Sequence, residues 1–156
     1  MERLDLARIA AVDRSGPTLN SVIETNPDAL TIAAERDAER RAGKVRGPLH
    51  GIPVLIKDNI DTVDLPTTGG FYALRDSFPL QDAEQTRRFR AAGCVIIAKA
   101  NLSEFASGAA LSTLGGQILN PHVLERSPSG SSGGTGAGIA AGFAVFGLGT
   151  DTGGSI

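Results

Sequence analysis

The glycine- and serine-rich stretch at residues 126–156 constrains the fold of this chain more than any other part of it. Half of the twenty glycines fall between Gly130 and Gly154. They form two clusters, GSSGG at 130–134 and TGGS at 152–155, which flank an apolar segment. Glycine lets the main chain approach another group closely, and successive backbone N–H groups form concave sites for anions. The stretch predicts either a pair of loops that stabilises negative charge beside serine hydroxyls or two ordinary loops around a helix of small residues.

Composition favours one globular domain and gives no sign of a nucleic-acid or membrane partner. The 156 residues carry 15 Lys and Arg against 17 Asp and Glu, so the net charge of −2 provides no basic surface for nucleic acid or anionic lipid. The N-terminus lacks the apolar core of a signal peptide. No apolar run approaches the roughly 20 residues of a membrane-spanning helix, and we therefore expect a cytoplasmic protein. The one cysteine, Cys94, lies in an apolar run and is expected in the core.

Hydrophobic patterning and helix-breaking residues predict alternating helices and strands, which is typical of an α/β fold. Two apolar runs, 52–56 and 94–98, are too continuous to have one wet face and predict buried strands that end at Lys57 and Lys99. A helical pattern over 82–92 separates them and favours parallel pairing. The other expected elements are helices over 2–14, 26–42 (with Asn26 as N-cap), 101–106 and 135–145, strands over 19–24 and 146–149, and a loop-rich segment over 107–133.

Two familiar motifs match the glycine-rich stretch by their letters but lack the required surroundings. The pattern G-x-S-x-G at 130–134 fits the nucleophile elbow of α/β-hydrolases, which needs a strand before its serine and a histidine after it in the chain. Both histidines, His50 and His122, precede it. The pattern G-x-G-x-x-A at 136–141 imitates a dinucleotide-binding motif, yet no strand precedes it and no acidic residue follows at the expected spacing. A serine nucleophile in this chain therefore needs a base other than histidine.

Lysine is the base that the sequence offers. The chain has three lysines, and Lys44 lies in a polar turn, where we expect it to be solvated. Lys57 and Lys99 each end a buried strand, and the carboxyl ends of parallel strands commonly face a ligand crevice. Burial lowers the pKa of a lysine because it disfavours the ammonium form, so a neutral amine becomes available as a base. The alternative for each is an ion pair with a carboxylate such as Asp58 or Glu104, and spacing alone does not choose between the two lysines.

Three segments of the chain, taken in order, resemble the amidase signature family. They are GPLHGIPVLIKDNIDT at 47–62, AKANLSEFA at 98–106 and SPSGSSGGTGAGIAAGFAVFGLGTDTGGSI at 127–156. The long glycine- and serine-rich segment is far more specific than a single short motif, and the matches cover most of the chain from Gly47 onward. The resemblance implies an α/β fold around a mixed sheet flanked by helices. It also implies a Ser–cis-Ser–Lys triad that hydrolyses an amide carbon–nitrogen bond without a metal or organic cofactor.

The resemblance assigns the triad residue by residue. Lys57 matches the family lysine in GIPVLIKD, Ser131 matches the cis-serine as the first of the pair in GSSGG, and Ser155 matches the nucleophile in GTDTGGS. In these roles Ser155 attacks an amide carbonyl while its proton passes through Ser131 to neutral Lys57.

Further residues of the two clusters are expected to support this triad. Backbone N–H groups of Thr152, Gly153, Gly154 and Ser155 are expected to bind the developing oxyanion. Ser132 is expected to hydrogen-bond within the same network. Asp151 is expected either to orient the loop or to be an ordinary structural aspartate.

The resemblance also bears on domains, substrate and partners. Because family members are much longer, we expect residues 1–156 to be a single truncated amidase domain, with a helical N-terminal region at 1–46 and the start of the catalytic α/β core at 47–156. The expected substrate is a small-molecule amide. The alternatives are the ammonia-releasing A-type subunit of a glutamyl-tRNA amidotransferase and an inactive fragment that lacks its C-terminal portion. A homodimer is also possible, and the sequence does not decide between these forms.

Overall fold

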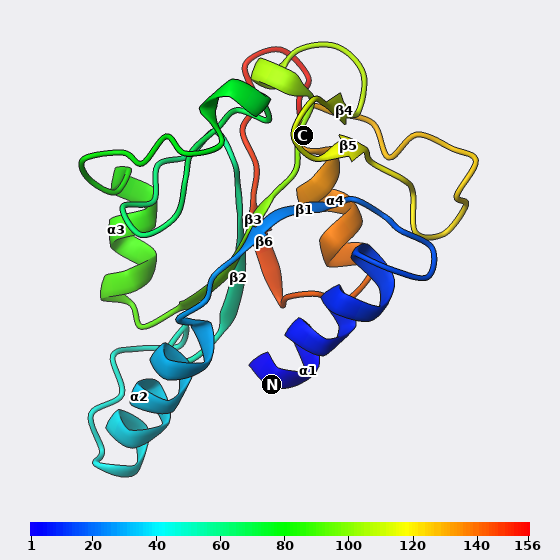
Figure 1. The fold of residues 1–156 in the computed structure, drawn as a ribbon. Helices are drawn as coiled ribbons and strands as arrows, with labels where there is room; N and C mark the ends of the chain where they lie inside the picture. The colour runs from blue at the N-terminus through cyan, green and yellow to red at the C-terminus, as the bar shows by residue number, and fades with distance from the viewer.

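A four-stranded mixed sheet lies at the centre of the computed structural model, which describes residues 1–156 (Figure 1). The strands are β1 (Val22–Thr25), β2 (Pro53–Lys57), β3 (Val95–Ala100) and β6 (Phe146–Leu148), in the spatial order β1–β3–β2–β6. β2 runs parallel to both β3 and β6, whereas β1 is antiparallel to β3. The predicted α/β fold with a mixed sheet is confirmed.

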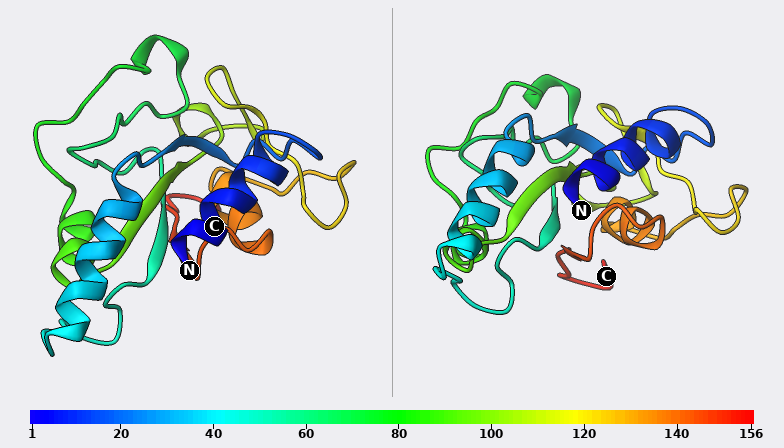
Figure 2. Two further views of the ribbon diagram at one scale, coloured as in Figure 1. Left: turned by 60° about the horizontal axis from the view of Figure 1, so that its bottom comes forward. Right: turned by 90° about the horizontal axis from the view of Figure 1, so that it is seen from below.

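Helices lie on both sides of this sheet. They are α1 (Glu2–Arg8) with a π-helical continuation (Ile9–Asp13), α2 (Ala29–Arg41), α3 (Glu84–Ala91) and α4 (Gly133–Ala140). Figures 1 and 2 show α1 and α4 on one side of the sheet and α3 on the other. Single 3₁₀ turns at Tyr72–Leu74 and Glu104–Ala106 and a small hairpin of β4 (Leu111–Ser112) and β5 (Gly116–Gln117) complete the elements. No helix has both the length and the apolar character needed to cross a membrane.

The two central strands are buried along their whole length, as the continuous apolar runs predicted. Alternate residues of β2 face opposite sides of the sheet. Leu55 packs into the larger apolar cluster, which includes residues of the first two helices, and Ile139 of α4 packs against it. Ile56 belongs to the smaller cluster, together with Cys94, and Phe89 of α3 packs there. Burial on both faces explains why these strands carry no alternating polar residues.

The first helical segment is tied to the sheet by a buried carboxylate that the sequence did not single out. Asp13 accepts hydrogen bonds from the backbone N–H of Ser21 (2.7 Å), from the Ser21 hydroxyl (2.6 Å) and from the N–H of Val22 (3.2 Å). These bonds fix the residues that lead into β1. Residues 1–46 therefore contribute an edge strand to the same sheet as the later part of the chain.

Several helix boundaries differ from those predicted. The helix expected over 101–106 is only a 3₁₀ turn at Glu104–Ala106, and the other large differences concern α2 and α4. Asn26 is not the N-cap of α2: the helix begins at Ala29 with Asp28 in the capping position, and Asn26 is buried with its amide donating to the carbonyl of Ile96 (2.8 Å). The last helix ends at Ala140 instead of near residue 145. The physical reason is Gly142, whose φ of +73° is a left-handed conformation that stops the helix.

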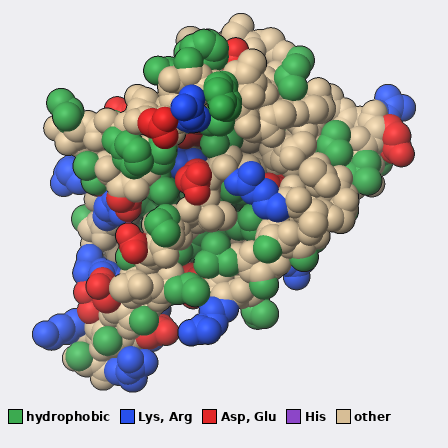
Figure 3. All heavy atoms as spheres, viewed as in Figure 1, with side chains coloured by type: hydrophobic (Ala, Val, Ile, Leu, Met, Phe, Trp, Pro, Cys, Tyr) green, Lys and Arg blue, Asp and Glu red, His purple; other side chains and the backbone are tan.

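Charged side chains gather over α2, and Figure 3 shows both signs interspersed there, at the lower left. Arg36 pairs with Glu39 (3.2 Å) and with Glu35 (3.0 Å). The charged residues of this helix are therefore paired with one another and do not form a single-sign patch.

Two glycines of α4 provide a matched test of close packing. A Cβ on Gly134 would lie 2.1 Å from the carbonyl oxygen of Asn101, whereas one on Gly136 would meet nothing within 4 Å. We expect Gly134→Ala to lower the free energy of unfolding by roughly 2 kcal/mol or more. We expect Gly136→Ala to raise it by up to about 1 kcal/mol, because alanine favours a helix over glycine. Urea unfolding followed by circular dichroism measures both, and equal effects would contradict the close approach of α4 to the sheet.

Candidate active site

The carboxyl end of β2 brings Lys57 to a cluster of hydroxyl groups. The lysine is fully buried. Its Nζ lies 2.6 Å from Ser131 Oγ, 2.9 Å from Ser132 Oγ and 2.8 Å from Thr150 Oγ1. The two serines directly precede α4 and the threonine follows β6. Three segments that are distant in sequence therefore meet at one amine.

Ser131 is held by its main chain as well as by this contact. The Gly130–Ser131 peptide bond is cis, as the resemblance predicted. The carbonyl of Ser131 accepts a hydrogen bond from the backbone N–H of Ser103 (3.1 Å), and the residue is buried. Ser103 follows β3 closely, so the strand next to β2 also helps to position the serine.

The amine of Lys57 has an unusually low pKa. Burial disfavours the ammonium form and lowers the pKa from 10.5 to about 8, and the negative charge of Asp151 opposes this shift. The groups in direct contact with Nζ are neutral hydroxyls and the carbonyl of Thr150, at 3.3 Å. A substantial fraction of the amine is therefore neutral near pH 8, as a general base requires.

Lys99, in contrast to Lys57, has a carboxylate as a direct partner. In the parallel register, Lys99 pairs with Ile56 and Lys57 pairs with Ala100, so the two lysines project from opposite faces of the sheet. The Nζ of Lys99 lies 3.2 Å from Asp58 Oδ1. It also donates to the carbonyls of Ile60 and Pro66 and to the hydroxyls of Thr62 and Thr67, at 2.8 to 3.0 Å. Lys99 thus has the carboxylate partner that was the alternative for both lysines, and Lys57 does not.

The structure brings the backbone of Ser155 into the site but not its hydroxyl. Its carbonyl accepts hydrogen bonds from the N–H (3.1 Å) and the hydroxyl (2.5 Å) of Ser132. The Ser155 hydroxyl takes part in none of the hydrogen bonds of the site. Ser132 is therefore part of the network, as expected, and it links Lys57 to the loop that carries Ser155.

Asp151 organises that loop. Its Oδ1 accepts hydrogen bonds from the backbone N–H groups of Gly154 (2.5 Å) and Ser155 (3.0 Å), and these bonds hold the pKa of its carboxyl group below the usual range. Two of the four N–H groups expected at an oxyanion therefore contact a carboxylate of the chain itself. Thr152 and Gly153 are exposed in the same loop.

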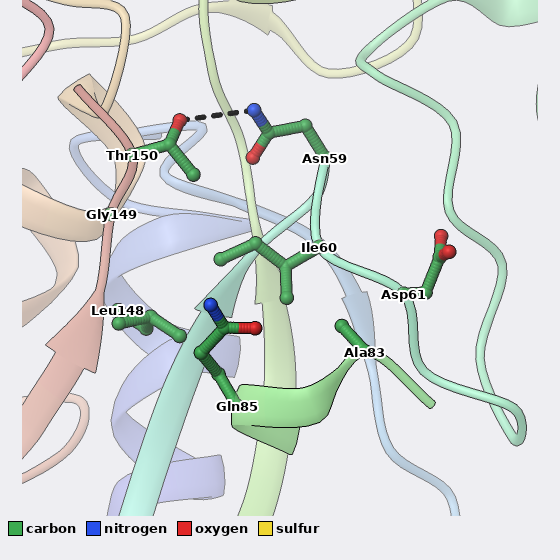
Figure 4. Close-up of a pocket in the computed structure, with 8 residues that line it drawn as sticks. All are labelled: Asn59, Ile60, Asp61, Ala83, Gln85, Leu148, Gly149 and Thr150. Carbon is green, nitrogen blue, oxygen red and sulfur yellow. Dashed lines mark hydrogen bonds between the residues drawn. The ribbon is translucent and has the colours of Figure 1, made fainter. Parts of the chain in front are cut away.

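Sequence reasoning missed Thr150 and Asn59. Figure 4 shows both at a pocket of about 240 Å³ beside the site, where the side-chain amide of Asn59 donates to Thr150 Oγ1 (3.0 Å). Each residue follows the end of a parallel strand, the same signal that selected Lys57. The sequence did not reveal that β6 lies next to β2, and this adjacency is what brings Thr150 to the lysine. Nowhere in the chain do three or more His, Cys, Asp or Glu side chains form a group that would hold a metal ion.

The sequence matches a known protein family, and the fold matches solved structures. The family model described as Amidase matches residues 5–156. The chain belongs to the amidase family. A crystal structure of the peptide amidase from Stenotrophomonas maltophilia superposes with a TM-score of 0.96 at 50% identity, over 99% of this chain and 33% of that one. An amidase family protein from Bacillus anthracis superposes with a TM-score of 0.95 at 39% identity, over 99% of this chain and 32% of that one.

The chain is also similar to a subunit of an amidotransferase. The glutamyl-tRNA(Gln) amidotransferase of Rhodopirellula baltica has an A-type subunit that is 44% identical over 150 residues, which cover 95% of this amidase-family chain and 30% of the relative. The chain thus spans a quarter to a third of the length of the relatives that it matches.

The low pKa of Lys57 makes stability depend on pH. Between about pH 8 and 10.5 the unfolded state holds a proton on this lysine that the folded state has released. The free energy of unfolding should therefore rise with pH across this window, by at most about 1.4 kcal/mol per unit. In Lys57→Met this increment should be missing. Urea unfolding of both proteins at pH 8, 9 and 10 measures it, and a constant difference between them would contradict the lowered pKa.

The Lys99–Asp58 pair makes a second prediction. Lys99→Met leaves the fully buried carboxylate of Asp58 without its cation, so we expect the free energy of unfolding to fall by about 3–5 kcal/mol. Adding Asp58→Asn removes the uncompensated charge and should recover part of the loss. Thermal and urea unfolding of the single and double variants test this. A double variant that is no more stable than Lys99→Met would show that the loss has another origin.

Proposed function

We propose that this chain carries the catalytic centre of an amidase that hydrolyses a small-molecule carboxamide through an acyl-enzyme on Ser155. The observation that supports the proposal most directly is the 2.6 Å contact between the Lys57 amine, with its pKa of about 8, and the buried Ser131 hydroxyl. A lysine with no direct carboxylate contact and a hydroxyl at hydrogen-bond distance match a base and a proton relay. The names of the relatives point to the same class of reaction.

The proposed reaction begins with proton transfer. Neutral Lys57 takes the proton of the Ser131 hydroxyl while Ser131 takes that of Ser155, and Ser155 Oγ bonds to the carbonyl carbon. The C–N bond then breaks as the same relay returns the proton to the leaving nitrogen. Water attacks the resulting ester with the same general-base assistance, and the acid product leaves with Ser155 restored. No external oxidant or reductant is needed.

The oxyanion is assigned to the main chain of the loop after β6, at Thr152, Gly153 and Gly154, with the N–H of Ser155 beside them. Backbone donors aimed at a developing negative charge are a major source of rate enhancement. For Gly154 and Ser155 this role requires their N–H groups to leave Asp151 Oδ1, to which they donate at 2.5 and 3.0 Å. The backbone of Gly153 also stabilises the Asp151 carboxylate, so Thr152 is the donor of this loop that can take the oxyanion role without that exchange.

A second candidate is an A-type amidotransferase subunit that releases ammonia from glutamine. The 44% identity to such a protein from R. baltica favours it. The triad chemistry is the same, because glutamine presents a primary carboxamide. The two candidates differ in partner: the first acts alone or as a homodimer, and the second requires a companion subunit. In either form we expect the rest of the substrate pocket to come from the part of the relatives that this chain does not span.

Covalent labelling tests the nucleophile. We expect a fluorophosphonate to add once to this chain, as measured by intact mass, and the adduct to be absent in Ser155→Ala, because the attacking oxygen is gone. Ser131→Ala should slow labelling at least tenfold, since the relay is broken. The exposed loop residue Ser127 supplies the control, and Ser127→Ala should label at the parent rate.

Three other outcomes would change the assignment. Labelling that survives in Ser155→Ala but is lost in Ser132→Ala would move the nucleophile to Ser132. Absence of labelling in the parent would support the inactive-fragment alternative. Among labelled proteins, turnover of simple carboxamides without a partner would favour the free-standing amidase, whereas glutamine turnover that requires a partner would favour the amidotransferase.

A further inference from the structure

Asn59 connects the pocket in Figure 4 to the buried lysine through one intermediate hydroxyl. Its Nδ2 donates to Thr150 Oγ1 at 3.0 Å, and the same oxygen lies 2.8 Å from Lys57 Nζ. Asn59 is exposed on the pocket wall, where Gln85 also projects (Figure 4). The pocket and the lysine therefore share a hydrogen-bonded oxygen.

The hydrogen-bond capacity of a neutral Lys57 limits how its three hydroxyl neighbours can be arranged. A neutral amine has two N–H donors and one lone pair, and a hydroxyl has one donor and two acceptor positions. Ser132 donates its proton to the carbonyl of Ser155 (2.5 Å), so it faces the amine as an acceptor. If Thr150 Oγ1 also accepts, and shares its N–H with the more distant Thr150 carbonyl (3.3 Å), both N–H groups are used and the lone pair is left for the hydroxyl of Ser131. If Thr150 instead donates, it competes with Ser131 for the lone pair.

We propose that Asn59 is a positioning residue that holds the Thr150 hydroxyl as an acceptor toward Lys57 and so leaves the amine lone pair facing Ser131. This inference rests on the proposed role of Lys57 as the base. The amide of Asn59 fills one acceptor position of Thr150 Oγ1 and fixes that oxygen beside Nζ, where the second position receives an N–H of the lysine. Asn59 acts through Thr150 and makes no contact of its own with Lys57.

Few charged groups lie near Lys57, so a new charge next to Thr150 is expected to change the pKa of this lysine. Asp151, on the loop after β6, is the charge that acts on Lys57. Lys99 of β3 and its partner Asp58, which directly follows β2, lie on the opposite face of the sheet. The residues of α4 next to the amine are uncharged, and Asp61 lines the pocket beside Asn59. A carboxylate introduced at position 59 would be a new anion one hydroxyl away from Nζ.

Lysine NMR measures the effect directly because the chain has only three lysines. Carbon-13 labelling of lysine Cε gives three titration curves, which Lys44→Arg and Lys57→Met assign. In Asn59→Asp, a carboxylate accepts the Thr150 proton and its charge stabilises the ammonium form. We expect the pKa of Lys57 to rise by about 0.5–1 unit, in the range of a partly solvated neighbouring charge.

Gln85→Glu is the matched control, since it adds the same charge to the same pocket without a hydrogen bond to Thr150. We expect it to shift the pKa of Lys57 by less than about 0.2 unit. In a Thr150→Val background, the through-space effect of the charge remains but the part that the hydroxyl transmits is lost, so Asn59→Asp should shift the pKa of Lys57 by less than half as much. Equal shifts in the two charge variants, or an undiminished shift without the Thr150 hydroxyl, would overturn the relay.

The NMR titration of Lys57 tests this inference independently of the proposed function. The titration of Lys57 needs no acylation, so a failure of fluorophosphonate labelling would reject the nucleophile and leave the relay measurable. Where labelling occurs, a rise of one pKa unit from about 8 lowers the neutral fraction at pH 8 about fivefold. For the expected shift of about 0.5–1 unit, the labelling rate of Asn59→Asp should fall about two- to fivefold at pH 8 and recover near pH 10. A loss that is the same at every pH would indicate structural damage and contradict the relay.

Discussion

A buried amine without a directly contacting carboxylate is the feature on which this site depends. Lys57 and Lys99 are both fully buried and both lie near the carboxyl ends of neighbouring strands. Burial alone therefore does not distinguish a base from a structural lysine. The partners do: Lys99 is surrounded by a carboxylate and several oxygens that satisfy an ammonium, whereas Lys57 faces neutral hydroxyls and one carbonyl. The amino-terminal end of α4, next to Ser132, further disfavours a positive charge at this point.

The two faces of the sheet are linked by one loop. The residues after β2 wrap around the ammonium group of Lys99, which donates to the carbonyls of Ile60 and Pro66. The same loop presents Asn59 to Thr150, and Thr150 contacts Lys57. A structural ion pair on one face thus fixes the loop that serves the amine on the other. This arrangement explains why a costly buried charge pair lies so close to the candidate base, since its partners define the path of the backbone.

The elements set by local patterns could be predicted, and those set by tertiary contacts could not. Continuous apolar runs predicted the buried strands β2 and β3, and the strand-end rule selected Lys57 and Lys99 as candidates. Discrimination between them required the sheet register, which places Lys99 and Ile56 on one face. In isolation, Asn26 is predicted to cap the helix. In the fold its Nδ2 donates to the carbonyl of Ile96, in a strand 70 residues away, and its side-chain oxygen accepts from the N–H of Asp28 (2.9 Å), in a turn that precedes the helix. Asp13 and Thr150 were missed for the same reason, since their partners lie on segments whose positions only the fold supplies.

The loop that carries Ser155 shows which part of the proposed chemistry is already in place. Its main chain is fixed at both ends, by Ser132 at the carbonyl of Ser155 and by Asp151 at the N–H groups of Gly154 and Ser155. Those N–H groups already bind a negatively charged oxygen, so the backbone of this loop suits an anion. Rotation about the Cα–Cβ bond of Ser155 moves its hydroxyl without disturbing any of these backbone contacts. The proposed catalysis needs this rotation and also needs the N–H groups of Gly154 and Ser155 to be released from Asp151 Oδ1. In the proposed mechanism, binding of an amide substrate supplies the interactions for both changes.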